Sequence, residues 1–385
     1  MFDKISRIGF SVLFICMLVI PLLTTNLQQD KLSKSENRKL APMAELYKED
    51  GTLNGKFASD LETWINDNIG LRDWFVVNNA KMQFYVFDVL ANNSDSFLGP
   101  EGELNYATKS MLVDYQHLNL RTTKELEEIA ESFQICAEYL EQKGIPFYYF
   151  QCWDKHSIYP EYFPDTVLQY GSVSKTDQLV EILKEKTDIV VISPKNELIN
   201  AKLQYDTYSE WGDATHWTQR GAFIGYNILM SEINQKSNRK YKVLTEEDYQ
   251  IDITDQGSTL FGGIHKEDYI EKFSINNPKA YLTEEAPAWL SQWQSRSRTI
   301  YQNDCIDNED VLLVLGDSYF DSYLYDDFAE SFHKVVFIWG DYFGELVDIV
   351  DYYQPTIVVA ENAERCDRTK LVILAAEKIQ DMYGY

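Results

Sequence analysis

Histidine and cysteine are scarce in this chain, and neither forms a metal-binding pattern. The 385 residues include 5 histidines and 5 cysteines, with no CxxC, HExxH or HxH spacing. Protein zinc sites require closely spaced histidine, cysteine or carboxylate ligands. The sequence therefore gives no support for a metal site, and we expect no cofactor.

The cysteines also lack the spacing of a disulfide framework. Cys16 lies in an apolar N-terminal run, and Cys136, Cys152, Cys305 and Cys366 are widely separated. Disulfides form readily outside the cytoplasm, so pairing stays open, but isolated buried thiols fit this spacing equally well.

Basic residues are far fewer than acidic residues in this chain. The chain has 35 Lys and Arg against 61 Asp and Glu, which gives a formal net charge of -26 at pH 7. Nucleic acids and anionic lipid surfaces repel such a protein, so we expect no nucleic-acid partner. A neutral or weakly charged partner fits better. Aromatic residues make up 14% of the chain, and sugar-binding grooves use such rings, although most rings pack in cores.

One long uncharged run stands at the N-terminus. Lys4 and Arg7 precede it, and no charged residue occurs from Ile8 to Gln29. Such a run can cross a hydrocarbon core of about 30 Å, and positive flanking charge favours a cytoplasmic N-terminus. We predict a single-pass membrane anchor over 1–29 with the rest outside the cytoplasm. A cleaved signal peptide stays open, although PLLTTNLQQD lacks a clear small-x-small cleavage site.

Residues 30–94 are expected to form a juxtamembrane stretch and a helical lead-in. Apolar residues recur at helical spacing through ASDLETWINDNIG and LRDWFVVNNAKMQFYVFDVL, which predicts two helices. Pro100, Glu101 and Gly102 then separate two β-prone runs, which predicts a hairpin at the start of the main domain, 95–385.

In the main domain, short apolar runs alternate with amphipathic stretches. The predicted strands are IPFYYFQC, DIVVIS, VLLVLGD, KVVFIW and PTIVVA. The predicted helices cover 122–143, 174–186, 218–233 and 345–353. This alternation predicts an α/β fold with a parallel sheet flanked by helices. Residues about 241–310 break the rhythm and are interpreted as an insertion.

A serine follows one of the predicted strands. VLLVL leads directly into Gly316, Asp317 and Ser318, and reactive residues gather at the carboxyl ends of parallel strands. Glycine lets the backbone turn there without a Cβ clash. Ser318 at a helix start presents its hydroxyl and its own N–H to one cleft, so it is a candidate both for the nucleophile and for an oxyanion donor. The alternative is that Asp317 or Ser318 only caps the next helix.

A carboxylate and a histidine stand three residues apart in GDATHW. Asp213 and His216 precede a predicted helix that starts near Thr218. A serine nucleophile needs a general base, and the base needs its second ring nitrogen held by a carboxylate. We therefore assign His216 as candidate base and Asp213 as the residue that orients it. A loop histidine beside a solvated aspartate is the alternative.

Further site candidates follow from charge and position after apolar strands. Lys155 and Arg365 can bind a sugar hydroxyl or carboxylate, or each can form an ion pair with Asp154, Glu361 or Glu364. Asn362 is a candidate second oxyanion donor, with a strand-end amide as the alternative. Trp217, beside His216, is a third substrate-binding candidate.

The serine and D-x-x-H segments together resemble the SGNH hydrolase superfamily. Here Asp213 and His216 precede Ser318, the reverse of the order in ordinary SGNH esterases, and this permuted order resembles alginate O-acetylation proteins of the AlgJ and AlgX type and DHHW-containing bacterial proteins. Further segments resemble that family in the same order: ENRKLAP, FASDLETWINDNIGLR, FLGPEGELNY, WDKHSIYPEYFPD, THWTQRGAF, LGDSY and QPTIVVAENAER. One departure is Ala214, which stands where the relatives carry the triad aspartate, so Asp213 must act from one residue further back.

The resemblance implies O-acetylation of an exported or cell-wall polysaccharide through an acetyl-serine. It also implies an integral-membrane acyltransferase that supplies the acetyl group. Two alternatives stay open: a carbohydrate acetylesterase that uses the same triad with water, and a non-catalytic SGNH fold that acts as a scaffold in polysaccharide export.

Overall fold

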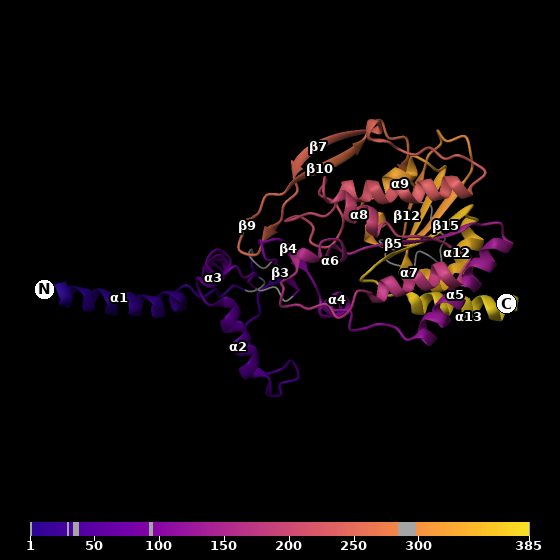
Figure 1. Ribbon diagram of the computed structural model, residues 1–385. Helices are drawn as coiled ribbons and strands as arrows, with labels where there is room; N and C mark the ends of the chain where they lie inside the picture. Colours follow the sequence, from indigo (N-terminus) through magenta and orange to yellow (C-terminus); the bar gives the residue numbers. More distant parts are fainter. Residues whose placement is uncertain (1, 29–30, 34–37, 92–94, 284–297, 385) are drawn as a thin grey trace. The chain divides into compact units, whose positions relative to one another are not determined.

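The protein forms two compact units in a computed structural model that describes residues 2–28, 31–33, 38–91, 95–283 and 298–384 (Figure 1). The first unit comprises 1–94 together with 259–266, and the second comprises 95–258 together with 267–385. The candidate catalytic residues all belong to the second unit.

The first unit is mainly helical. Its helices are α1 (Phe2–Leu23), α2 (Phe57–Asn68) and α3 (Arg72–Phe87), and its short strand pairs are β1 (Leu32–Ser33) with β2 (Arg38–Lys39) and β8 (Thr259–Leu260) with β9 (Ile264–His265). Helices α2 and α3 confirm the predicted helical lead-in. Arg38 donates two hydrogen bonds of 2.7 Å to Asp67, and this pairing lowers the pKa of Asp67 to about 2.

Helix α1 covers most of the run in which we expected a membrane anchor. Among the residues that the structure describes, no helix combines the length and the apolarity needed to cross a bilayer. The transmembrane helix expected over 1–29 is therefore not found in this part of the chain.

A seven-stranded sheet forms the centre of the second unit, in the order β11-β12-β14-β13-β15-β5-β6. Strands β14, β13, β15, β5 and β6 are parallel, whereas β12 pairs antiparallel with β14 and β11 pairs antiparallel with β12 at one edge. The bounds are β5 (Phe147–Cys152), β6 (Val190–Ile192), β11 (Tyr281–Leu282), β12 (Arg298–Gln302), β13 (Val311–Gly316), β14 (Lys334–Trp339) and β15 (Ile357–Ala363). The five parallel strands are the five predicted apolar runs, while β12, inside the segment interpreted as an insertion, was not predicted.

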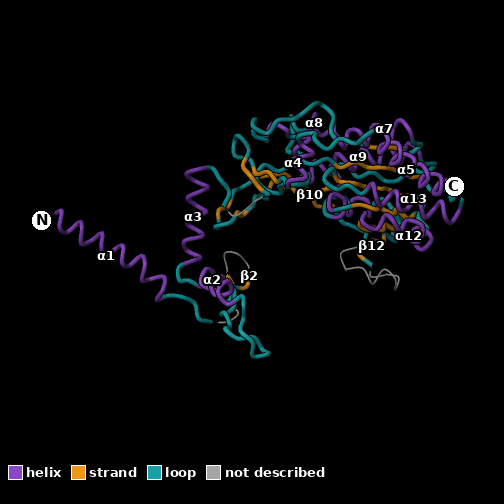
Figure 2. Tube along the Cα trace, turned by 90° about the horizontal axis from the view of Figure 1, so that it is seen from below, coloured by secondary structure: helices purple, strands orange, loops and turns teal. Residues whose placement is uncertain are grey.

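Helices cover both faces of this sheet (Figures 1 and 2). Side chains of β5 alternate between two cores: Phe147 and Tyr149 pack on one face, and Tyr148 and Phe150 on the other. The first face carries α5 (Thr123–Gln142), α7 (Lys175–Lys186), α12 (Leu346–Tyr353) and α13 (Thr369–Tyr383), and the second carries α8 (Lys195–Ala201), α9 (Gln219–Lys236), α10 (Ser318–Asp321) and α11 (Tyr325–Ala329). This arrangement confirms the predicted α/β fold and the predicted helices in it.

Shorter elements connect the layers. The predicted hairpin is present as β3 (Ser96–Leu98) and β4 (Leu104–Tyr106), and Gly102 supplies a positive φ of 97° in its turn. A second hairpin, β7 (Tyr249–Asp255) with β10 (Tyr269–Ile275), occupies part of the segment interpreted as an insertion. The remaining elements are α4 (Lys109–Tyr115), α6 (Lys155–Ile158) and the 3₁₀ turns at Pro160–Tyr162, Glu246–Asp248 and Gly340–Glu345.

A glycine lets α9 approach the indole next to the candidate base. A Cβ at Gly225 would lie 2.9 Å from two ring atoms of Trp217, closer than real contacts allow. The Trp217 ring also packs against Phe150, with ring centroids 6.2 Å apart. This packing anchors the loop that carries His216 onto the sheet.

All five cysteines are free thiols, and Cys136 and Cys152 are buried.

One carboxyl group lies in the core beneath the second hairpin. Asp327 on α11 is 9% exposed and accepts a 2.8 Å hydrogen bond from the Tyr249 hydroxyl. Burial raises the pKa of Asp327 to about 7. The group therefore takes up a proton in the folded protein at pH values where an unfolded chain has lost it.

We predict that Asp327→Asn removes a pH-dependent loss of stability between about pH 4 and pH 7. In this window the unfolded chain has released the proton, because an unperturbed Asp has a pKa of about 3.9, while folded Asp327 still holds it. Stability therefore falls as pH rises, by up to about 1.4 kcal/mol per pH unit. Asparagine keeps an oxygen for the Tyr249 hydroxyl and does not titrate.

Urea unfolding of full-length protein in detergent at pH 4, 5.5 and 7 measures this difference. Asp348→Asn, at an exposed position of α12, is the matched control and should follow the wild type at every pH. Parallel stability curves for wild type and Asp327→Asn would contradict the assignment.

Candidate active site

The candidate nucleophile stands where β13 ends and α10 begins. The carboxylate of Asp317 accepts a 3.0 Å hydrogen bond from the Tyr319 N–H and so caps α10. Asp317 therefore caps the helix, and the Ser318 hydroxyl takes no part in capping. Its Oγ lies 2.7 Å from His216 Nε2.

Position 316, just before this turn, requires glycine because the buried carboxylate of Glu361 leaves no room for a side chain there. A Cβ at Gly316 would lie 2.6 Å from Oε2 of Glu361 on the neighbouring strand β15. The same oxygen accepts the Asp317 N–H at 2.6 Å. Burial, and then the nearby charge of Asp317, raise the pKa of Glu361 well above its ordinary value.

The histidine and the orienting acid share one loop before α9. Asp213 Oδ2 lies 2.7 Å from His216 Nδ1. The other carboxylate oxygen, Oδ1, accepts hydrogen bonds from the Thr215 N–H, the Thr215 hydroxyl and the His216 N–H, at 2.8, 2.7 and 3.1 Å. These bonds fold the loop back on itself, so the acid reaches the imidazole from position 213 without a carboxylate at Ala214.

The three groups form a continuous relay. Because Asp213 is an acceptor, it assigns the imidazole proton to Nδ1 and leaves Nε2 as the acceptor that faces Ser318. Burial alone would raise the pKa of Asp213, but the hydrogen bond and charge of His216, together with Thr215, lower it well below the ordinary value. Such a relay can deprotonate a serine hydroxyl and stabilise the imidazolium that results.

Two tyrosines next to the serine complete the surroundings and were not predicted. The Tyr323 hydroxyl donates to Asp213 Oδ2 at 3.2 Å, and its ring lies 5.7 Å from the imidazole, centroid to centroid. The Tyr319 hydroxyl lies 2.6 Å from the Thr215 carbonyl oxygen. The sequence signal was present in SYFDSY, but the fold decides which of its aromatic rings face the catalytic loop.

Of the substrate-binding candidates, Arg365 contacts the triad. Its Nη2 lies 3.0 Å from His216 Nε2, its Nη1 is paired with the buried carboxylate of Asp154, and its guanidinium lies 5.1 Å from the centre of the Tyr319 ring. Burial is the largest single influence and would lower the pKa of Arg365, but Asp154, Tyr319 and Asp317 together raise it. The ion pair considered for this arginine is therefore present, and its role in substrate binding stays a prediction.

Lys155 is buried beside the first hairpin. Its Nζ donates a 2.7 Å hydrogen bond to the Leu104 carbonyl oxygen and lies 5.1 Å from the centre of the Tyr162 ring. Burial lowers the pKa of Lys155 to about 8. Among the described residues, Lys155 forms no ion pair with Asp154, which pairs with Arg365 instead.

Among the described residues, neither Trp217 nor Asn362 forms a hydrogen bond with Ser318, whose Oγ contacts His216. Trp217 is fully buried in the core, so its ring is not available to a sugar, which corrects its proposed role in substrate binding. The Asn362 amide donates to the Ala363 carbonyl oxygen at 2.9 Å, and none of its hydrogen bonds within the described residues reaches Ser318. Among those residues, nothing accepts a hydrogen bond from the Ser318 backbone N–H, which leaves it available as an oxyanion donor.

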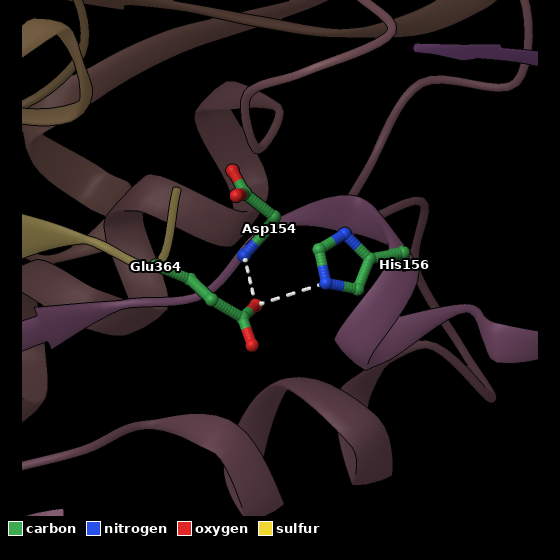
Figure 3. A group of neighbouring side chains, drawn as sticks. All are labelled: Asp154, His156 and Glu364. Carbon is green, nitrogen blue, oxygen red and sulfur yellow. Dashed lines mark hydrogen bonds and ion pairs between the residues drawn. The ribbon is translucent and has the colours of Figure 1, made fainter. Parts of the chain in front are cut away.

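A buried trio of metal-ligand residue types lies behind Arg365: Asp154, His156 and Glu364 (Figure 3). Glu364 accepts the Asp154 N–H at 3.0 Å and lies 3.6 Å from His156 Nε2. The Asp154 carboxylate points away from the other two side chains, and it pairs with Arg365. These contacts join the carboxyl ends of β5 and β15 and hold the arginine beside the triad.

The chain matches no protein-family model and no curated protein. Among solved structures it is similar to PatB1 of Bacillus cereus, with 15% sequence identity and a TM-score of 0.53 over 72% of this chain and 100% of that chain. A DHHW family protein of Eubacterium siraeum is a further structural neighbour, with 14% identity and a TM-score of 0.44 over 66% of this chain and 88% of that chain. Another is the O-acetyltransferase domain of Pseudomonas putida AlgJ, with 15% identity and a TM-score of 0.45 over 74% of this chain and 99% of that chain. The similarity to PatB1 shows a shared fold, and the AlgJ and DHHW types suggested by the motif order are among the neighbours.

We predict that Asp213→Asn slows covalent labelling of Ser318 by a sulfonyl fluoride at least about 100-fold. An asparagine amide donating to Nδ1 would hold the imidazole in the wrong tautomer, a change that costs about 10,000-fold in a serine-protease triad. Intact-protein mass spectrometry of full-length protein measures the labelling rate. Tyr323→Phe, which removes a single hydrogen bond to Asp213, should stay within about tenfold of wild type. Unchanged labelling of Asp213→Asn, with Ser318→Ala unlabelled, would mean that another group orients His216.

Proposed function

We propose that this chain is an extracytoplasmic O-acetyltransferase that acts on a polysaccharide through an acetyl-serine at Ser318. The observation that carries this proposal is the relay from Ser318 Oγ through the imidazole to Asp213, with both contacts at 2.7 Å. The permuted order of the family-like segments, which resembles that of the alginate O-acetylation proteins, supports the choice of acyl transfer.

The first half-reaction loads the enzyme. Ser318 Oγ attacks the carbonyl carbon of the acetyl donor while its proton moves to His216 Nε2. The negative charge on the carbonyl oxygen is stabilised by the free Ser318 N–H. The donor oxygen then leaves with the proton from Nε2, and the acetyl group remains as an ester on Oγ.

The second half-reaction unloads it. A sugar hydroxyl gives its proton to His216 Nε2 and attacks the acetyl carbon. The tetrahedral intermediate collapses, the sugar acetate departs, and Oγ regains its proton from Nε2. The net reaction exchanges one acetyl group and one proton between two oxygens, so its atoms and charges balance.

Arg365 is assigned to substrate binding in this scheme. Nε2 has one lone pair, and both the Ser318 hydroxyl and the guanidinium are within hydrogen-bond distance of it. A guanidinium that turns to an acyl or sugar oxygen of a bound substrate releases Nε2 to the serine. Substrate binding and activation of the nucleophile are thereby linked.

Two other functions compete with this one. A carbohydrate acetylesterase uses the same first half-reaction and differs only in that water resolves the acetyl-serine. A scaffold for polysaccharide export needs no reactive serine, and the assembled relay of Ser318, His216 and Asp213 favours catalysis over that role.

The acetyl donor partner is proposed to be an integral-membrane acyltransferase. Residence at the membrane would hold the enzyme near that partner and near the emerging polymer, which raises the effective concentration of both. The uncharged run from Ile8 to Gln29 supports a location at the cell membrane with the catalytic unit outside the cytoplasm.

We predict that full-length protein in detergent releases acetate slowly from an activated acetyl ester, and that Ser318→Ala and His216→Ala each lower the rate at least about 100-fold. Members of a triad act as one unit, so either change removes most of the activity. Transfer to added oligosaccharide, followed by mass spectrometry, separates a transferase from an esterase.

Thr259→Ala, at an exposed position outside the catalytic unit, is the control for these two variants and should keep the wild-type rate. Wild-type rates in both Ser318→Ala and His216→Ala would remove the catalytic assignment. Retention of the cellular role by Ser318→Ala would favour the scaffold.

We further predict that the full-length protein sediments with membranes and that protease added to intact spheroplasts digests its catalytic unit. An epitope tag at the C-terminus, followed by immunoblotting, reports the digestion, and a cytoplasmic protein serves as the control for intact cells. A tagged catalytic unit that survives protease until the spheroplasts are lysed would refute the proposed location.

A further inference from the structure

A cavity of about 420 Å³ lies between the second hairpin and the helices that follow Ser318. Its walls come from the start of α9, from β7, β10 and β12, and from 321–330. Ligand pockets in proteins span about 300–1,000 Å³, so the cavity is large enough for a small ligand or one unit of a polymer.

Residues from both catalytic segments border this cavity. Gln219 lies three residues after His216, and Asp321, Ser322 and Tyr323 follow Ser318 on the same short turn of chain. Tyr323 borders the cavity, and its hydroxyl donates to the Asp213 carboxylate at 3.2 Å. This side chain therefore joins the cavity to the Asp213 end of the relay.

The cavity wall is rich in aromatic rings. Sugar rings stack their C–H faces against such side chains, which present a large apolar area. Tyr301 and Tyr323 are partly exposed, and burial raises the pKa of Tyr301 to about 12, with the charge of Asp326 adding to the shift. The aromatic lining residues are Phe223, Tyr249, Phe273, Tyr301, Tyr323 and Tyr325.

The ionisable carboxyl groups of the wall meet no cationic side chain among the described residues. Asp321, Asp326, Asp327 and Glu330 line the cavity, and Asp327 keeps its proton up to about pH 7. Lys279 lies between two lining residues in the sequence, but its side chain is exposed and is not part of the wall. Carboxylates accept hydrogen bonds from hydroxyl and ammonium groups and repel other carboxylates and phosphates.

We propose that this cavity is the acceptor subsite, and that it takes a sugar unit which offers hydroxyl or amino donors and carries no acidic group. This inference rests on the proposed function, because it names the class of polysaccharide that the acetyl-serine meets. Aromatic walls hold the ring, carboxylates accept its donor groups, and the negative charge excludes uronic acids and phosphorylated sugars.

Binding to the full-length Ser318→Ala protein in detergent tests the proposal without turnover. Isothermal titration calorimetry compares a glucosamine tetramer, a neutral glucose tetramer and a galacturonic acid tetramer at low ionic strength. We expect the glucosamine oligomer to bind tightest and the galacturonate to bind at least about tenfold more weakly than the neutral oligomer, which corresponds to about 1.4 kcal/mol. Equal or tighter binding of the galacturonate, or no binding of any of the three, overturns the proposal.

Two further substitutions locate the binding in the cavity. Asp326→Asn removes an exposed carboxylate and should weaken glucosamine binding at least about fivefold. Ser322→Trp fills the cavity from an exposed position and should abolish binding of all three oligomers. Asp348→Asn, exposed on α12, is the matched control for loss of one negative charge. Wild-type affinity in both Asp326→Asn and Ser322→Trp overturns the proposal.

The binding experiment can fail separately from the proposed acetyl transfer at Ser318. Oligosaccharide binding at the cavity by a protein that forms no acetyl-serine would refute acetyl transfer alone. Acetyl transfer by a protein that prefers galacturonate would refute the subsite alone.

Discussion

The carboxylate of Asp317 is the contact on which the catalytic geometry depends. It accepts hydrogen bonds from the Tyr319 N–H at 3.0 Å, from the Ala363 N–H at 2.8 Å and from Arg368 at 3.0 Å. Its own N–H is bound by buried Glu361. One residue thus caps α10 and ties the end of β13 to the end of β15, so Ser318 is held by the central strand of the sheet and its neighbour.

A second set of buried charges positions the residues around the base. Asp154 at the end of β5 pairs with Arg365, which follows β15 and contacts His216. Glu364 secures the backbone of Asp154, and the Tyr319 hydroxyl lies 3.0 Å from the Asp154 carboxylate. Removing one member of such a network leaves its partner buried and uncompensated, which makes each of these groups more important than its isolated contact suggests.

Acidic residues have two distinct uses in this protein. Buried carboxylates near the triad are matched by arginines or by several N–H donors, as at Asp317 and Asp154. Those that line the cavity beside Tyr323 meet no cationic side chain of the described residues in its wall, and Glu330 accepts the N–H groups of Lys279 and Ala280. In the acceptor subsite that we propose, this negative charge favours donors of hydrogen bonds and disfavours anions.

The sequence by itself predicted the parallel strands, most of the helices around them, and the three side chains, Ser318, His216 and Asp213, that the structure brings into contact. Apolar strands between amphipathic helices have one well-packed arrangement, and a serine at a strand end near a D-x-x-H loop has a recognisable chemical use. Only the tertiary structure decided that Arg365 reaches His216, that Trp217 is buried, that the Asn362 amide donates to the Ala363 carbonyl oxygen, and that β12 extends the sheet. These outcomes depend on which strands are neighbours and how deeply each side chain is covered. Such contacts join residues up to about two hundred positions apart, as between Asp154 and Arg365, and no local pattern in the chain encodes them.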